Sequence, residues 1–307
     1  MGIRFPPRRL FFLLALSLLA ACAPTAAGPA IDLSDLQPLE GVTPAPSPLR
    51  VAVAAVISPQ GTVETYGPFL DYLSRKVGRP VELVQRRTYA EINDLIEEGE
   101  VDVAFVCTAA YVEGRDAFGM QLLAAPQVNG ATVYYSVLIV PRDSPAQSMA
   151  DLSGKVFAFT DPLSTTGRMY PAFLVQQLGL TPDRFFARTF FTYSHDEAIR
   201  AVAGGLADGA AVDSLVYDYA LSRDPGLPEK VRVIHRSPAF GIPPVVVGPG
   251  VRPQVAAEIA DVLFGMAGDP DAREALAAMQ IEAFVPIDDS AYDSVRELLA
   301  AVGDVQP

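Results

Sequence analysis

Cysteine, histidine and tryptophan are scarce in this chain of 307 residues, which contains two cysteines, two histidines and no tryptophan. Two cysteines cannot form a disulfide framework, and two histidines leave little material for a histidine-rich metal site. Basic residues are few as well, because 23 Lys and Arg stand against 36 Asp and Glu, a formal net charge of -13. A surface this negative repels nucleic-acid phosphates and anionic lipid headgroups. We therefore expect no zinc chemistry and no nucleic-acid partner.

The amino terminus carries a short apolar segment rather than a membrane span. Residues 10–19 are apolar and follow three arginines. About ten apolar residues are too few to cross a bilayer, which needs about 20, but they suit the core of an export signal. The segment ends in Leu19-Ala20-Ala21-Cys22, which resembles the bacterial lipobox, where the chain is cut before a cysteine that is then lipidated. We predict a signal peptide over residues 1–21 and a lipid anchor on Cys22; a plain secreted protein is the alternative.

Residues 22–48 show no hydrophobic periodicity. They are rich in Ala, Pro, Gly and Ser, with six prolines between positions 24 and 48. A flexible chain of this length reaches roughly 30 Å, and proline stiffening lengthens that reach. We predict a tether that lets the globular body stand clear of a membrane surface.

From residue 49 onward, short apolar runs alternate with amphipathic segments. Half of all residues are hydrophobic and 19% are charged, which supplies a large core. The length suggests about two domains, at roughly 100 to 200 residues each. Residues 49–57, 81–85 and 101–107 are predicted strands, and the segments between them have helical spacing. Thr88 with Glu91 matches a capping box at the second helix. This β-α-β-α-β pattern predicts a parallel α/β sheet.

A second stretch repeats the pattern. Its predicted strands are residues 132–140, 155–159, 189–193, 210–213, 231–235 and 245–247. Ser194 with Glu197 matches another capping box, and residues 253–302 have helical spacing with few strand signals. Polar residues follow the carboxyl ends of several of these strands, which is the edge where ligands bind in open α/β sheets.

The most informative of these loops is Ser164-Thr165-Thr166-Gly167. Three hydroxyls beside a glycine, at the start of a helix, offer side-chain O–H and backbone N–H donors to an anion. An ordinary helix N-cap is the alternative, but a cap needs one hydroxyl and not three.

Two motifs resemble the signatures of one family. Residues 161–167, Asp-Pro-Leu-Ser-Thr-Thr-Gly, resemble the Asp-Pro-x-Ser-Thr-Ser-Gly signature of the PhnD-like proteins that bind phosphate, phosphite or phosphonate. Residues 194–196, Ser-His-Asp, resemble that family's Ser-His-Asp. Further similarities fall in order, so the resemblance covers about residues 49–219 closely and the remainder loosely. Thr166 departs from the signature, which commonly has serine at that position.

The resemblance implies an α/β, two-lobed type II periplasmic-binding-protein fold. Each lobe would hold a mostly parallel sheet flanked by helices. The first lobe would comprise residues 49–135 plus 239–307 and the second residues 136–238, with two hinge crossovers between them. It also implies a monomer outside the cytoplasm that closes on a small oxyanion (phosphonate, phosphite or phosphate) and delivers it to the permease of an ABC importer. Because sensing uses the same closure, an input protein for a membrane histidine kinase is the alternative.

The expected ligand residues come from both lobes. They are Ser164, Thr165, Thr166, Gly167, His195 and Asp213 from the second, and Tyr66, Thr108 and Tyr111 from the first. His195 would sit in the first turn of its helix, where the dipole favours a neutral imidazole that can still donate one N–H. Asp213 suits a ligand that keeps a proton or carries an amine, because an ionised carboxylate can only accept. Tyr89 and Tyr170 are interpreted as helix-face packing.

Cys107 lies where the family is expected to have a small Gly/Pro-containing loop. Related arsenite-sensing proteins are understood to use a cysteine in such a loop, and a thiolate suits a soft metalloid, so Cys107 is a possible metalloid ligand. A small buried hydrophobe is the simpler interpretation.

No Walker A run, GxSxG elbow or paired catalytic carboxylates are present. An enzyme would therefore rest on Cys107 with His195 as base, a remote alternative, and neither catalysis nor a cofactor is expected.

Overall fold

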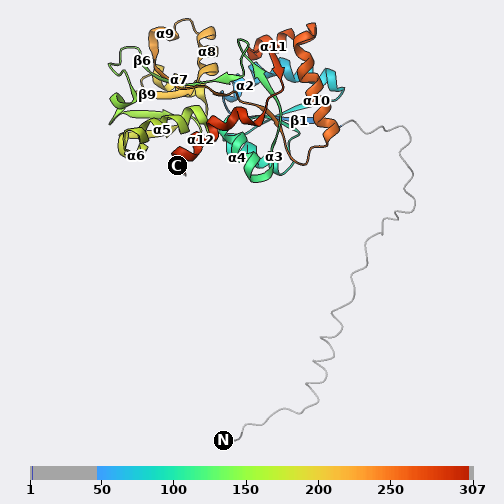
Figure 1. Ribbon diagram of the computed structural model, residues 1–307, viewed down its shortest axis with the longest axis horizontal. Coiled ribbons are helices and arrows are strands. Elements are labelled where there is room, and N and C mark those ends of the chain that lie inside the picture. The colour runs from blue at the N-terminus through green and yellow to red at the C-terminus, as the bar shows by residue number, and fades with distance from the viewer. Residues whose placement is uncertain (1, 3–46, 304–307) are drawn as a thin grey trace, which may run out of the picture. The chain divides into compact units, whose positions relative to one another are not determined.

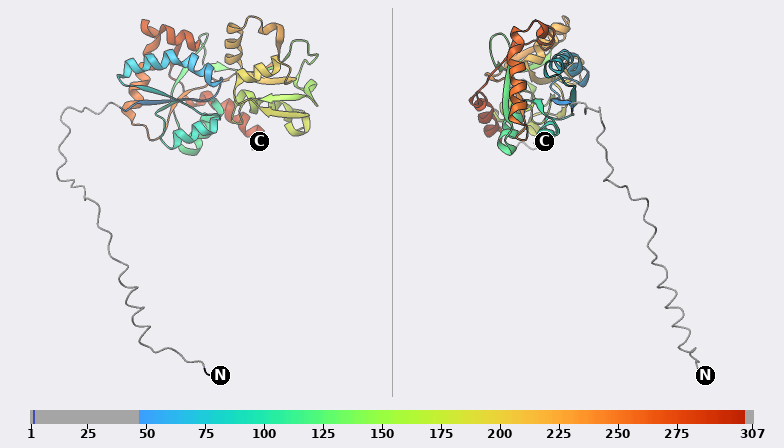
Figure 2. Two further views of the ribbon diagram at one scale, coloured as in Figure 1. Left: turned by 180° about the vertical axis from the view of Figure 1, so that it is seen from behind. Right: turned by 90° about the vertical axis from the view of Figure 1, so that its right-hand side faces the viewer.

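The computed structural model describes residue 2 and residues 47–303 (Figure 1). Its elements form two lobes side by side, each built around one sheet with helices on both faces (Figure 2). The predicted signal peptide, Cys22 and nearly all of the tether lie outside the described residues. In the part of the chain that is described, none of the helices is long and apolar enough to cross a membrane.

The first lobe surrounds a six-stranded sheet in the order β13-β4-β12-β3-β1-β2. Its strands are β1 (Leu49–Val53), β2 (Val81–Gln85), β3 (Val103–Phe105), β4 (Gln121–Gln127), β12 (Val245–Val247) and β13 (Ala283–Val285). One face packs on α2 (Pro59–Val77), α10 (Pro253–Gly265) and α11 (Arg273–Met279). The other face packs on α3 (Tyr89–Glu97), α4 (Thr108–Phe118) and α12 (Asp293–Val302). Val51 and Val53 point to one core and Ala52 to the other, which explains why this strand has no polar face.

The second lobe surrounds a five-stranded sheet in the order β10-β6-β9-β7-β8. Its strands are β6 (Ser136–Pro141), β7 (Val156–Phe159), β8 (Arg188–Phe191), β9 (Gly209–Asp213) and β10 (Val231–Arg236). Helices α7 (His195–Ala203), α8 (Ser214–Arg223) and α9 (Leu227–Lys230) pack on one face. Helices α5 (Tyr170–Gln177) and α6 (Pro182–Phe185) pack on the other. As α2, α3 and α4 follow β1, β2 and β3 in the first lobe, α5, α7 and α8 follow the carboxyl ends of β7, β8 and β9, so the amino-terminal turns of these helices lie at the sheet edges that face the other lobe.

Two short strands join the lobes. The strands β5 (Val133–Tyr134) and β11 (Phe240–Gly241) pair with each other in antiparallel fashion where the chain leaves the first sheet and where it returns. The segments that cross between the sheets are thus held together by backbone hydrogen bonds.

The lobes contact each other through backbone groups at helix starts. The N–H of His195 donates to the carbonyl of Val56 at 2.9 Å. The N–H of Ser58 donates to the Asp196 carboxylate at 2.9 Å. All four residues lie at or just before the starts of α2 and α7, so the structure shows the lobes in a closed arrangement.

The fold class is confirmed, with differences of detail. Parallel pairing holds for β1, β2 and β3 and for β7, β8 and β9, whereas the other strand pairs are antiparallel, so the sheets are mixed rather than mostly parallel. Strands β4 and β13 were not predicted from the sequence. The apolar run at residues 132–140 is two strands, because the N–H of Tyr135 donates to the Ser214 side chain instead of a ladder.

Candidate functional site

The loop before α5 is held in a tight helical turn. The Ser164 hydroxyl accepts from the Gly167 N–H at 3.0 Å. The Ser164 carbonyl accepts from the N–H groups of Arg168 and Met169. Residues Thr165–Met169 form a π-helical turn, a form often found at functional sites. A Cβ at Gly167 would lie 1.8 Å from the Thr160 hydroxyl oxygen, so only glycine fits against the end of β7.

The three hydroxyls of this loop have different partners. Thr165 Oγ1 lies 2.7 Å from Thr108 Oγ1 of the first lobe and accepts from the Ala109 N–H at 3.0 Å. The Ser164 hydroxyl already accepts from the Gly167 N–H as the helix cap. Thr166 Oγ1 is buried and has no hydrogen-bond partner within residues 47–303. We refer to Ser164, Thr165, Thr166 and Thr108 as the hydroxyl cluster.

His195 presents one N–H to this cluster. Its Nδ1 accepts from the Asp213 backbone N–H at 2.9 Å, so the proton of the neutral ring resides on Nε2. Nε2 lies 3.4 Å from the Ser164 hydroxyl oxygen. Burial lowers the pKa of His195 to about 3, which keeps the imidazole neutral. The predicted neutral donor is present, although burial is the main cause rather than the helix dipole.

Asp213 ends β9 and caps α8. Its Oδ1 accepts from the Leu215 N–H at 2.7 Å. Burial raises the pKa of this carboxyl to about 7, which brings its titration close to neutral pH. Tyr66 shares a cavity wall with Asp213, and burial together with that neighbouring charge raises the pKa of the Tyr66 phenol.

Cys107 is buried beside the cluster. Its sulfur lies 3.8 Å from Thr165 Oγ1, and burial raises the pKa of the thiol. The imidazole of His195 contacts Ser164 and the Asp213 backbone instead. A thiol with a raised pKa lacks the thiolate character of a cysteine nucleophile, so the Cys107 and His195 pair is not arranged as in a thiol enzyme.

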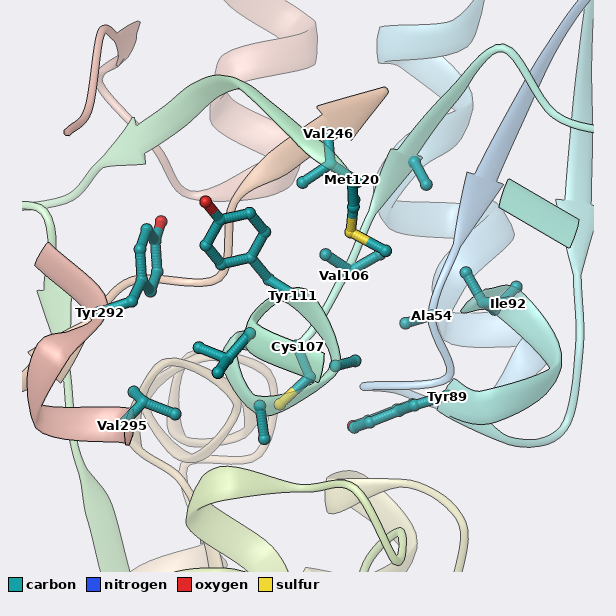
Figure 3. Packing of buried hydrophobic residues seen from close by; sticks show 14 of the residues in the cluster. Ala54, Tyr89, Ile92, Val106, Cys107, Tyr111, Met120, Val246, Tyr292 and Val295 are labelled. Carbon is teal, nitrogen blue, oxygen red and sulfur yellow. The ribbon is translucent and has the colours of Figure 1, made fainter. Parts of the chain in front are cut away.

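The structure separates Tyr111 from the other predicted ligand residues. The Tyr111 hydroxyl donates to Asp289 at 2.6 Å. Its ring packs against Tyr292 with 4.8 Å between centroids, inside the first lobe (Figure 3). A phenol held by a carboxylate in this way has no proton left to donate, so a direct ligand role for Tyr111 is not supported.

Two tyrosines that the sequence analysis did not select lie at the cluster. The Tyr134 hydroxyl is 2.8 Å from Thr108 Oγ1. The Tyr89 hydroxyl is buried without a hydrogen-bond partner among the described residues, and Figure 3 shows its ring pointing from α3 toward the end of α4 that carries Cys107. Burial, with Cys107, Asp161 and Asp213 nearby, raises the pKa of the Tyr89 phenol. Tyr89 has helical spacing, which indicated packing on a helix face. Its position in the first turn of a helix that follows a strand could have indicated a place at the ligand edge of the sheet.

A cavity of about 370 Å³ lies between the lobes next to this site. Asp213 and Tyr66 are on its wall, together with residues from α2, α8 and the segment after β11. The site therefore has two parts: a buried group of neutral donors, and a larger space beside it.

Comparisons with known proteins identify the family of this chain. Residues 51–292 match the family described as the periplasmic substrate-binding protein of phosphonate ABC transporters. The phosphonates-binding periplasmic protein of Escherichia coli is 26% identical over 255 residues, which is 81% of this chain and 75% of that protein. The phosphate-import protein PhnD of Mycolicibacterium smegmatis is 26% identical over 260 residues, covering 78% and 81%.

Solved structures show the same fold. The binding-protein component of an ABC phosphonate transporter from Pseudomonas aeruginosa has a TM-score of 0.77 at 24% identity, over 84% of this chain and 90% of that one. PhnD1 of Prochlorococcus marinus, solved with methylphosphonate, has a TM-score of 0.74 at 18% identity, over 82% and 97%. Since the family match spans most of the chain and both lobes align, this chain belongs to the phosphonate family of extracytoplasmic substrate-binding proteins of ABC transporters.

Proposed function

We propose that this chain captures an oxyanion of the phosphonate class at the hydroxyl cluster and delivers it to an ABC importer. The supporting observation is that three buried hydroxyls have no hydrogen-bond partner within residues 47–303, and two of them, Thr166 of the second lobe and Tyr89 of the first, come from opposite lobes; the third is Thr160, behind Gly167. A buried polar group without a partner costs about 1 to 3 kcal/mol, so such groups are retained where a ligand completes them.

The hydrogen-bond donors at the proposed oxyanion site are uncharged. The His195 Nε2–H and the hydroxyl cluster can each donate to an anionic oxygen, and the amino-terminal turn after Ser164 adds backbone N–H groups. Asp213, when protonated, can donate to the anion, and when ionised it can accept from a P–OH group. Both states suit a phosphonate, whose own protonation changes near neutral pH.

Isothermal titration of protein purified in detergent from cells that express the full chain tests this proposal. The ligands are phosphate, phosphite, methylphosphonate, 2-aminoethylphosphonate and arsenite. A charge-assisted hydrogen bond contributes roughly 1.5 to 3 kcal/mol, so Thr166→Val and Tyr89→Phe should each weaken phosphonate binding about tenfold to a hundredfold. Neither should lower the melting temperature of the unliganded protein, because neither hydroxyl has a hydrogen-bond partner within residues 47–303.

Two other variants serve as comparisons. Ser164→Ala removes a helix cap and should cost about 1 kcal/mol of unliganded stability in addition to affinity. Thr181→Val changes an exposed threonine whose side chain makes no cap hydrogen bond, and should alter neither quantity. The proposal fails if no phosphorus oxyanion binds, or if Thr166→Val and Tyr89→Phe keep affinity within about twofold. Binding of arsenite alone, lost in Cys107→Ala, would instead favour the sensory alternative.

We also propose the domain limits and the anchor predicted from the sequence. The strand membership of the two sheets supports lobes at residues 49–135 plus 239–307 and 136–238. The sequence around Cys22 supports a lipid anchor. The monomeric state expected for the family is part of the same proposal. Cys22→Ser should abolish cleavage and lipidation, and recovery of membrane-bound mature protein of unchanged mass would refute the anchor.

A further inference from the structure

The cavity between the lobes lies beside the proposed oxyanion site, because two residues of its wall are hydrogen-bond partners of His195. The N–H of His195 donates to the Val56 carbonyl, and His195 Nδ1 accepts from the Asp213 N–H. Val56 and Asp213 both line the cavity. A ligand whose oxyanion sits at His195 and the hydroxyl cluster would therefore direct its remaining atoms into this space.

The wall of the cavity is largely apolar and comes from both lobes. Its apolar residues include Val56, Ile57, Leu215, Val216, Ile242, Pro243, Met279 and Ile281. Among its polar residues, Thr65 is satisfied by a hydrogen bond to the Tyr219 hydroxyl at 3.3 Å. Asn129, Asp218 and Gln280 are exposed to solvent, which places them at the rim. The part nearest the oxyanion site thus offers mainly hydrocarbon contacts, with the Asp213 carboxyl and the Tyr66 phenol as the polar groups on that side.

The size of the cavity exceeds what an inorganic oxyanion needs. A water molecule occupies about 30 Å³ in the liquid, so a cavity of 370 Å³ has room for about twelve groups of that size. Phosphate has five heavy atoms, and they would sit at the hydroxyl cluster beside this space. With such a ligand, the apolar wall would remain facing water in the closed form.

We propose that the ligand is an organophosphonate whose substituent on phosphorus is an apolar chain or ring of about four or more carbons. This inference rests on the proposed function. A short aminoalkyl substituent fits less well, because its ammonium would lose its hydration against a wall that is largely apolar. Asp213 accepts a backbone N–H through Oδ1, so only its other oxygen could accept from that ammonium. The rim acid Asp218 is exposed to solvent.

Titration with a homologous series tests the inference on protein purified in detergent from cells that express the full chain. The ligands are phosphate, methylphosphonate, n-propylphosphonate, n-butylphosphonate and 2-aminoethylphosphonate. Butylphosphonate should bind about fiftyfold more tightly than methylphosphonate, since three further methylenes are buried. The propyl and aminoethyl compounds have equal numbers of heavy atoms, and the propyl compound should bind at least about tenfold more tightly.

Filling the cavity should remove this preference. Leu215→Trp from α8 and Ile281→Trp from the first lobe each place an indole in the space, so the butyl-to-methyl affinity ratio should fall toward one. Two variants are used because either one could fail to fold. Leu206→Trp adds the same side chain at a position that is 68% exposed and should keep the wild-type ratio.

The outcomes separate the two proposals. Methylphosphonate or phosphate binding as tightly as butylphosphonate would overturn the apolar-substituent inference and leave the proposed function standing. Tighter binding of 2-aminoethylphosphonate than of n-propylphosphonate would do the same. Binding of none of these compounds would overturn both.

Discussion

Replacing Asp213 by asparagine should make the unliganded protein more stable, and the gain should grow with pH. Asp213 is buried at the end of β9, where burial raises its pKa from 3.8 to about 7. Asparagine is nearly isosteric, and its side-chain oxygen can still accept from the Leu215 N–H that Asp213 Oδ1 now binds. The substitution thus removes the titration of the carboxyl and keeps the helix cap.

The sign follows from proton linkage. A carboxyl whose pKa is higher in the folded state binds its proton more strongly there, so its contribution to stability is fully present below pH 3.8 and is lost as pH rises toward 7. The slope over that window is about 1.4 kcal/mol per pH unit. The advantage of the asparagine variant should therefore increase through this range, to about 4 kcal/mol at most near pH 7, and then level off.

His195 contributes with the opposite sign. Its pKa falls from 6.5 to about 3 on burial, so its contribution is present above pH 6.5 and is lost as pH falls toward 3. Both proteins share this contribution and that of every other group. Taking the difference between the asparagine variant and the wild type removes it.

Urea unfolding of both proteins between pH 4 and 8, without ligand, measures the difference. Asp71→Asn serves as the control because Asp71 is an exposed carboxylate on α2. A difference that stays flat with pH, or that favours the wild type more strongly as pH rises, would show that Asp213 is not held in a protonated, desolvated state.

Other expectations follow from the same site. Gly167→Ala should destabilise the protein by about 1 to 3 kcal/mol, because its Cβ would meet Thr160, and adding Thr160→Ala should recover part of that loss in thermal melts. Cys107 should react slowly with iodoacetamide in the folded protein at pH 8 and rapidly in urea, as followed by mass spectrometry of its peptide; fast labelling of the native state would contradict a buried thiol of raised pKa. Small-angle scattering should give a smaller radius of gyration with saturating butylphosphonate than without ligand, whereas an unchanged radius would mean that closure does not depend on ligand.

Local patterns predicted much of the fold because several elements are determined by nearby residues. The Thr88 capping box is present as predicted, and the β-α-β-α-β order of residues 49–107 is confirmed. The second predicted box at Ser194 is absent, because Asp196 binds the Ser58 N–H of the other lobe and Glu197 pairs with Arg200. Partners distant in the sequence thus decide which of two acceptable local arrangements forms.

The parts that were missed depend on tertiary pairing. The three residues of β13 form a strand because they pair with β4, and nothing within Ala283–Val285 separates that strand from a buried helix segment. Tyr111 was predicted to bind the ligand and Tyr89 to pack on a helix face, and the difference between these two residues also depends on tertiary contacts. Both have tyrosine chemistry near a strand end, and only the position of Asp289, 178 residues beyond Tyr111, shows which hydroxyl is already satisfied.

The strand order also determines when each sheet can be completed. The second sheet uses strands between β6 and β10, so all of them are present once residue 236 has been made. In the first sheet, β4 pairs with β12 and β13, which come more than a hundred residues later, and β12 also separates β4 from β3. A chain that emerges amino terminus first would therefore fold its middle section before its beginning, and residues 49–127 would need protection from aggregation until the last strands arrive.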